Sequence, residues 1–277
     1  MKRIEAFLKY LEEIGRSKTT IITYKGVLEG IWKALGTKIV YPARLQEYFL
    51  SLNFEKPRTL HKKLAVIKSY FQWLIRTGVV KLDPTPDVVL PPIPYDLPKA
   101  VEYDELQRVI EGIEGEEFIP RRDRAIFELG YAIGARVGDL RQANVEDLDM
   151  DRMLFHARGK GNKEAYIPFG ESARDALQKY LEKRTGVANG ESTALFLNTG
   201  GSRLTNIWKI VKKYTTATPH SFFRHSAATH LLQNGAELRD VQEFMRHASP
   251  NTTALYTKVN PQRLRSEYNA HHPRARR

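Results

Sequence analysis

The sequence has no cysteine among its 277 residues. This absence excludes disulfide bonds and metal sites built on thiolates. No apolar run approaches the roughly 20 residues that a membrane-spanning helix needs, and no signal peptide opens the chain. We therefore expect no membrane partner and a cytoplasmic protein.

Motifs of several common enzyme classes are also missing. The phosphate-binding pattern G-x-x-x-x-G-K-[ST] does not occur, nor does the H-E-x-x-H pattern of zinc enzymes. The G-x-S-x-G turn of serine hydrolases is absent as well. His220, His225 and His230 lie in one region, but neighbouring acidic ligands that would complete a metal site are missing. We expect neither a metal nor a cofactor.

Basic residues are in clear excess over acidic ones. The formal net charge is +12, and the content of 42% hydrophobic and 27% charged residues is that of a folded, soluble protein. Such an excess indicates a polyanionic partner, although charge alone separates nucleic acid poorly from a membrane surface. The length is sufficient for two domains, each with its own core.

Residues 1–82 have the apolar periodicity of a helical bundle. Apolar residues recur at steps of three and four in four stretches, and Gly15, Gly36 and Gly78 follow three of them. The aromatic residues at helical spacing are most simply core residues. Lys62 and Lys63 are candidate DNA contacts, with a solvated helix face as the simpler alternative. We expect a helical domain here.

A proline-rich stretch follows, at 83–99. Six prolines fall between residues 84 and 98, and proline both removes a backbone donor and disfavours helix at the preceding residue. The pattern predicts an extended linker between two domains. A linker of this length would let the two domains lie on opposite sides of a partner.

Residues 100–260 are expected to form a second domain. The patterns predict helices over 103–113, 122–133, 172–183, 207–215, 222–233 and 241–246. Strands are expected at 153–157 and 164–168 around a glycine-rich hairpin, with a further strand at 195–198. A basic tail, 261–277, follows. The fold class is mainly α with a small β-sheet (α+β).

One stretch, from His220 to Tyr256, gathers side chains suited to phosphate chemistry. His220, Arg224, His247 and Tyr256 supply an acid–base group, a fixed cation, a hydrogen-bonding group and a phenol. A phosphodiester is anionic, so its charge must be neutralised before an oxygen nucleophile can attack. Arginines stay protonated at neutral pH and bind phosphate oxygens bidentately, so no metal is required.

Five motifs in order resemble those of the tyrosine recombinases, and most closely those of the Xer branch. They are GARVGDL, RGKGNKEAYIP, HSFFRHSAATHLL, MRHAS and LYTKV. The resemblance covers essentially the whole chain and implies a site-specific recombinase that resolves chromosome or plasmid dimers. In such a recombinase, residues 1–82 would be a helical DNA-binding domain, residues 100–260 the catalytic domain, and the basic tail, 261–277, a contact with another subunit. It also implies double-stranded DNA with a specific site as partner, and a tetramer on DNA whose C-terminal segments are exchanged between subunits.

The resemblance assigns roles to particular residues. Arg136 and Arg224 would be the two phosphate-binding arginines, with Asp139 supporting the first. Lys160, in the expected hairpin, would protonate the leaving 5′ oxygen, and Tyr256 would be the nucleophile that forms a 3′-phosphotyrosyl intermediate. The remaining assignments are His220 and His247 as catalytic residues, and Lys163 and Arg246 as further candidate DNA contacts.

Two positions depart from the pattern of the family. The family has histidine three residues before the second arginine, whereas His220 lies four residues before Arg224. Residues four apart on a helix still share a face, or Ser221 could cap the helix after an insertion. The second departure is Arg246, which replaces a glycine and could either contact phosphate or crowd the site.

Other functions stay open at this point. An integrase or transposase of a mobile element would use the same chemistry. A DNA-binding relative with impaired catalysis would bind its site without forming a covalent adduct, and a topoisomerase-like enzyme would relax DNA without a target sequence.

Overall fold

A computed structural model describes residues 2–36, 41–94, 100–158, 164–189, 192–246 and 261–275, without the side chains of 261–264. The chain forms two compact units, Met1–Asp96 and Leu97–Arg277, each of which has its own hydrophobic core. None of the helices in the described ranges is long and apolar enough to cross a membrane.

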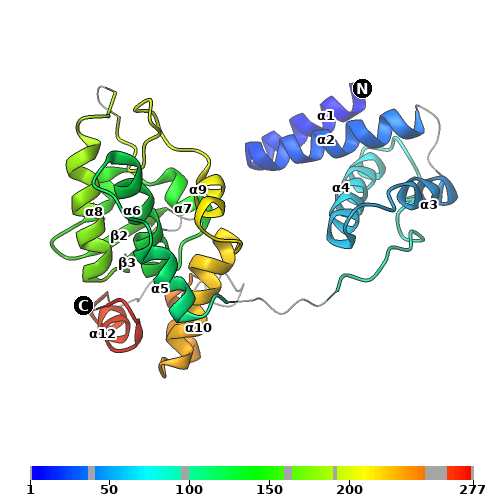
Figure 1. Cartoon of the computed structure of the whole chain (residues 1–277). Coiled ribbons are helices and arrows are strands. Elements are labelled where there is room, and N and C mark those ends of the chain that lie inside the picture. Colours follow the sequence, from blue (N-terminus) through cyan, green and yellow to red (C-terminus); the bar gives the residue numbers. More distant parts are fainter. Residues whose placement is uncertain are drawn as a thin grey trace. The chain divides into compact units, whose positions relative to one another are not determined.

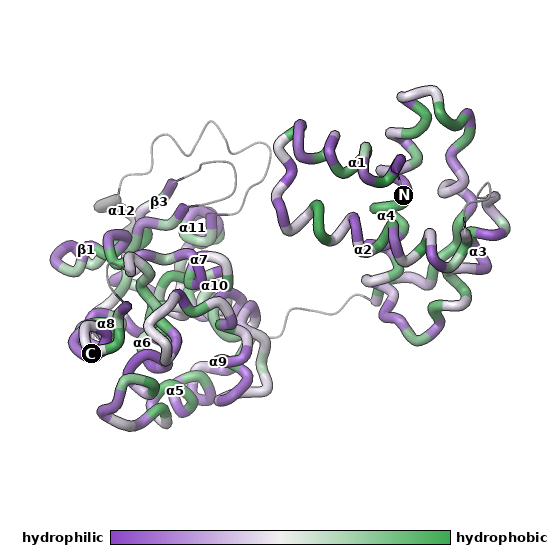
Figure 2. Tube along the Cα trace, turned by 90° about the horizontal axis from the view of Figure 1, so that it is seen from above, coloured by the Kyte–Doolittle hydropathy of each residue, from purple (hydrophilic) through white to green (hydrophobic). Residues whose placement is uncertain are grey.

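The first unit is built from four helices (Figure 1). They are α1 (Lys2–Glu13), α2 (Lys18–Leu35), α3 (Pro42–Ser51) and α4 (Pro57–Arg76). Figure 2 shows hydrophobic and hydrophilic residues alternating along these helices, as expected when one face is buried. The rings of Phe7, Tyr70 and Trp73 pack together in the core. The centroid of the Phe7 ring lies 5.2 Å from that of Tyr70 and 5.5 Å from that of Trp73. The prediction that these aromatic residues form a core is confirmed.

The described part of the proline-rich stretch contacts this first unit. Gln46 on α3 forms two hydrogen bonds with the backbone of Val89, of 2.8 and 3.1 Å. Thr85 is buried, and Val88 and Leu90 pack on the helical core. Residues 83–91 therefore belong structurally to the helical unit, because the side chain of Gln46 binds their backbone and their apolar side chains pack on the helices.

The second unit surrounds a buried helix with further helices and a small sheet. Its elements are α5 (Tyr103–Glu111), α6 (Phe118–Ala132), α7 (Val137–Gln142), η1 (Val145–Asp147), β1 (Leu148–Asp149), β2 (Leu154–Arg158), β3 (Glu164–Pro168), α8 (Glu171–Arg184), α9 (Ile207–Tyr214), η2 (His220–His225), α10 (Ser226–Gln233), α11 (Leu238–Phe244) and α12 (Pro261–His271). Ten of the fifteen residues of α6 are buried, including Phe127 and Tyr131. The predicted class, mainly α with a small sheet, is confirmed.

The sheet is antiparallel in the order β1-β2-β3, with Phe155 paired to Ile167 and Leu148 paired to Phe155. The strand expected at 195–198 is wrong. That segment forms only an isolated bridge, between Leu197 and Arg203, and side chains bind its backbone as well: the hydroxyl of Tyr180 accepts from Leu197, and Arg184 donates to the Leu195 carbonyl. Its apolar run reflects burial, which periodicity alone does not distinguish from a strand.

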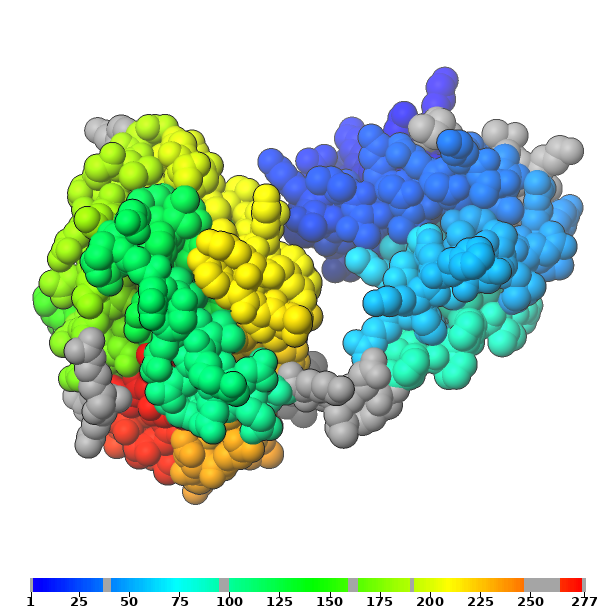
Figure 3. Space-filling view, viewed as in Figure 1, coloured from blue at the N-terminus to red at the C-terminus, as the bar shows by residue number. Residues whose placement is uncertain are grey.

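The described part of the tail, residues 261–275, packs on its own unit. Figure 3 shows this segment, in red, against the orange region of α10 and α11. Tyr268 is buried, and Arg274 donates to both oxygens of the buried Glu128 carboxylate, at 2.7 Å for Nε. The sequence predicted a basic tail of low apolar content, and the structure shows that a buried aromatic residue, a buried ion pair and hydrogen bonds between Asn234 and His271 hold it.

Candidate active site

The turn between α6 and α7 positions the first candidate residue. Gly134 ends α6 with φ of 54°, a left-handed conformation that favours glycine, and the chain then enters α7 at Arg136. The carboxylate of Asp139, three residues on, accepts a hydrogen bond of 2.9 Å from the backbone N–H of Arg136. Asp139 thus fixes the start of α7 and the backbone that carries Arg136.

Arg224 lies buried beside this turn and connects it to a second one. Its Nη1 donates to the carbonyl of Gly134 at 3.0 Å, and its Nη2 donates to the carbonyl of Met245, at the end of α11. Burial, followed by the charges of Arg136 and Arg246, lowers the pKa of the Arg224 guanidinium to about 10. Arg224 remains protonated at neutral pH.

Arg136 reaches the same second turn. Its Nη2 donates to the carbonyl of Arg246 at 3.1 Å. The side chain of Arg246 returns to Asp139, with 2.5 Å between its Nη2 and the carboxylate. Arg136, Arg224, Arg246 and Asp139 therefore lie together, although they come from three separate stretches of the sequence.

The extra residue between His220 and Arg224 is accommodated by a π-helical turn. η2 contains the whole run His220–His225, and the backbone N–H of Ser226 donates to the carbonyl of Ser221, five residues earlier. An α-helical turn holds about 3.6 residues, whereas a turn closed by bonds of this span holds nearly one more. Residues four apart in η2 are consequently placed much as residues three apart are in an α-helix.

Hydrogen bonds from neighbouring side chains hold this π-turn. The hydroxyl of Ser226 donates to the Ser221 carbonyl at 2.9 Å and accepts from the backbone of Val101 at 2.8 Å. His220 itself is exposed, and its ring contacts that of His225 with centroids 4.3 Å apart. Burial, followed by the charge of Arg224, lowers the pKa of His225, so His225 is neutral at pH 7.

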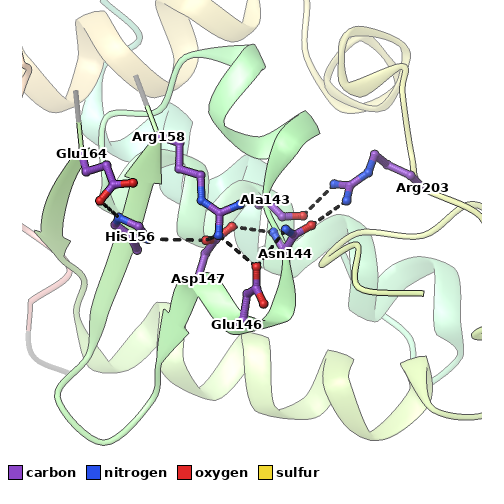
Figure 4. A network of polar contacts seen from close by, with 8 residues as sticks. All are labelled: Ala143, Asn144, Glu146, Asp147, His156, Arg158, Glu164 and Arg203. Carbon is purple, nitrogen blue, oxygen red and sulfur yellow. Dashed lines mark hydrogen bonds and ion pairs between the residues drawn. The ribbon is translucent and has the colours of Figure 1, made fainter. Parts of the chain in front are cut away.

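A polar network lies at the ends of β2 and β3 that adjoin residues 159–163 (Figure 4), and the sequence analysis did not predict it. Its centre is the buried Asp147, which forms an ion pair with Arg158 at 2.8 Å and accepts a hydrogen bond of 2.8 Å from the backbone N–H of Asn144. His156 lies between Asp147 and Glu164, at 3.6 and 3.3 Å. The spacing of Asn144 and Asp147, typical of a capping box, was the one available signal.

This network fixes both strands where they enter residues 159–163. Arg158 and Glu164 form the last described pair of the β2–β3 ladder. Lys160 and Lys163 lie outside the described residues, as do His247 and Tyr256. The described geometry therefore brings together Arg136, Asp139, Arg224 and Arg246, with His220 on the adjoining turn.

The two candidate contacts on α4 have different surroundings. Lys62 is exposed. Lys63 is partly buried and pairs with Glu55, with 2.5 Å between Nζ and the carboxylate. This ion pair is a structural role for Lys63 that its position in the sequence did not indicate.

Comparison with known proteins assigns both units. Residues 99–263 match the phage integrase family, and residues 4–78 match the N-terminal SAM-like domain of phage integrases. Tyrosine recombinase XerC of Corynebacterium glutamicum is 36% identical over 98% of this chain and 92% of its own length. Tyrosine recombinase XerD of Oceanobacillus iheyensis is 39% identical over 82% of this chain and 80% of its own.

Solved structures agree on the fold. The integrase of transposon Tn1549, in complex with circular intermediate DNA, has a TM-score of 0.69 at 20% identity, covering 96% of this chain and 98% of that one. The XerH recombinase bound to its palindromic difH substrate also has a TM-score of 0.69 at 20% identity, covering 96% and 83%. The chain belongs to the phage integrase family and is a tyrosine recombinase.

Proposed function

We propose that this chain is a Xer-type site-specific recombinase that cleaves and rejoins DNA through Tyr256. The observation that supports this most strongly is the position of Arg136 and Arg224. The guanidinium of Arg224 donates to the carbonyl of residue 245, and that of Arg136 donates to the carbonyl of residue 246, immediately before His247. Two fixed cations next to the segment that carries the histidine and the tyrosine are what attack on a phosphodiester requires.

In the proposed mechanism the arginines bind the non-bridging oxygens of the scissile phosphate. Attack by the Tyr256 oxygen on phosphorus places further negative charge on these oxygens, which guanidinium groups stabilise. The phenol, with an ordinary pKa of about 10, loses its proton during attack. His220, set in register by the π-turn, and His247 provide hydrogen bonds and proton transfer at the phosphate.

Cleavage is completed when the bond from phosphorus to the 5′ oxygen breaks. An alkoxide is a poor leaving group, so Lys160 donates a proton to it as it departs. The 3′-phosphotyrosyl bond conserves the energy of the phosphodiester. A 5′ hydroxyl from a second DNA strand can therefore attack phosphorus and release Tyr256, which rejoins the DNA without ATP.

On DNA we propose a tetramer that holds two duplexes and exchanges its C-terminal segments, within the cytoplasm. The contacts of α12 with its own unit form a complete docking site that a neighbour's segment could occupy. The chain lacks cysteine, so the double variant Glu171→Cys with Ala275→Cys contains a single pair of thiols that can be cross-linked. The two positions are close, because the backbone N–H of Glu171 donates to the carbonyl of Ala275 at 3.4 Å. Cross-links within one chain without DNA, and between chains on DNA, are expected; cross-links within one chain in both states would refute exchange.

The test of catalysis is a suicide substrate. The protein first enriches its binding sequence from a randomised DNA pool, and duplexes with that sequence and a nick beside each candidate phosphate are then incubated with it. The freed 5′-hydroxyl fragment diffuses away, so the covalent adduct accumulates on a denaturing gel. We expect an adduct with the wild type and with Tyr166→Phe, an exposed control tyrosine on β3, and none with Tyr256→Phe.

The alternatives give different results in the same assay. Tight binding without any adduct would indicate a DNA-binding relative with impaired catalysis. Cleavage of any supercoiled plasmid without the enriched sequence would indicate topoisomerase-like relaxation. An integrase of a mobile element would form the same adduct, but its enriched sequence would lie at the ends of that element rather than at one chromosomal site.

A further inference from the structure

We propose that Arg246 is a third phosphate-binding arginine of the active site, acting on the scissile phosphate together with Arg136 and Arg224. This inference rests on the proposed function, because it assigns a further residue to the same reaction. It concerns a position where the family pattern has a glycine, and therefore a property of this chain.

The first argument is location. The carbonyl of Arg246 accepts a hydrogen bond of 3.1 Å from the guanidinium of Arg136. The carbonyl of the preceding residue, Met245, accepts from the guanidinium of Arg224. The backbone of Arg246 is thus in direct contact with one phosphate-binding arginine and one residue away from the other.

The second argument is the unmatched hydrogen-bonding capacity of the side chain. The side chain of Arg246 is only 12% exposed, and its Nη2 is held by Asp139 at 2.5 Å. Its Nε is buried and, among the described residues, has no hydrogen-bond partner. Since a guanidinium group offers five N–H donors in a fixed plane, Asp139 can orient it while other donors serve an acceptor such as a phosphate oxygen.

The third argument is charge. Arg136, Arg224 and Arg246 bring three positive charges together, and the carboxylate of Asp139 offsets one of them. The repulsion is felt at Arg224, whose pKa is lowered first by burial and then by the charges of Arg136 and Arg246. A dianionic pentavalent phosphorane would neutralise the remaining two charges, so the excess favours the transition state over the free protein.

The fourth argument is the backbone. Arg246 has φ of 51°, the left-handed region that a side chain other than glycine's adopts at a cost. Glycine at this position would remove that cost. The chain retains an arginine in a conformation suited to glycine, which is expected where the side chain has a function.

The experiment compares cleavage by Arg246→Gly, Arg246→Lys and the wild type on the nicked duplex described above, at saturating DNA. We expect Arg246→Gly to lower the cleavage rate constant by about 10²-fold, as loss of one transition-state donor does, with little change in DNA affinity. The melting temperature is expected to fall as well, because Asp139 loses its ion-pair partner, so the rates are compared at a temperature at which circular dichroism shows both proteins folded. Arg246→Lys is expected to recover part of the rate. Arg239→Ala, which removes an exposed arginine of α11, is the control and should cleave like the wild type.

A second substrate separates a phosphate contact from a structural role. A methylphosphonate at the scissile position removes one negative charge and one hydrogen-bond acceptor. If Arg246 acts on the phosphate, Arg246→Gly loses less activity relative to the wild type on this duplex than on the ordinary one. Equal fold-losses on both substrates, or wild-type cleavage by Arg246→Gly, would overturn the inference, whereas absence of any wild-type adduct would overturn the proposed function itself.

Discussion

Replacement of Arg274 with methionine leaves the Glu128 carboxylate inside the catalytic unit without its partner. Glu128 is 2% exposed, and Arg274 donates to both of its oxygens. Removing one partner of such a pair costs about 3–5 kcal/mol, because the remaining charge stays buried. The chain can limit this cost by releasing residues 261–275, which exposes Glu128 to water. We therefore expect Arg274→Met to detach the C-terminal segment rather than unfold the whole unit.

The pH dependence of this variant follows from the carboxylate. Burial raises the pKa of Glu128 above its ordinary value of 4.5, although Arg274 opposes the change. Without Arg274 the pKa rises further. A raised carboxyl pKa contributes stability that is present at low pH and lost as pH rises through the folded-state value. The defect of Arg274→Met should consequently be largest at neutral pH and shrink toward pH 5.

The measurement is hydrogen exchange of residues 261–275 in the full chain. Arg274→Met should lower the protection of this segment by up to the cost given above. Arg265→Met, on α12 in the same segment, removes hydrogen bonds to the carbonyls of Arg152 and Met153 and should cost about 1 kcal/mol. A double variant, Glu128→Leu with Arg274→Met, should recover most of the protection. A single-variant loss below about 1 kcal/mol would refute the view that this buried pair fixes the tail.

Three further predictions concern the same tail and the π-turn. Gly170→Ala should also release the tail, because an added Cβ would overlap the carbonyl oxygen of Arg274. Limited proteolysis should then cut within residues 261–275, and a tail that stays protected would contradict the packing. Burial lowers the pKa of His272 to about 3, whereas in the released tail this histidine takes up a proton near pH 6.5. Protonation therefore favours the released tail, and protection of residues 261–275 from hydrogen exchange should fall by about 1.4 kcal/mol per pH unit below 6.5. In His272→Phe the protection should not fall. Deletion of Ser221 restores a three-residue spacing from His220 to the arginine; cleavage of the suicide substrate should stay within about tenfold, or about 1.4 kcal/mol in the barrier, and a larger loss would mean that the π-turn does more than restore register.

The helices were predictable because their apolar periodicity and their ends are local properties. Ser17 caps α2 by accepting from Thr20, and Gly15, Gly36 and Gly78 follow three of the helices of the first unit with positive φ. The convergence of Arg136 and Arg224 was predictable only through the motifs, since no local pattern brings these stretches together.

Other features depend on tertiary contacts that leave little trace in the sequence. β1 is only two residues long, too short for an alternating pattern. The π-turn follows from one inserted residue, but its existence depends on Ser226, which also binds Val101 from a distant stretch. The docking of Arg274 on Glu128 joins residues at opposite ends of the second unit's sequence, so neither indicates the other.

The most direct test of the central claim is to identify the residue that DNA is attached to. Trypsin cleavage after Arg246 and Lys258 gives a peptide, residues 247–258, in which Tyr256 is the only tyrosine. After the suicide reaction and nuclease digestion, mass spectrometry should find this peptide with a nucleotide 3′-phosphate on Tyr256. A nucleotide on any other residue, or an adduct that persists in Tyr256→Phe, would contradict the account.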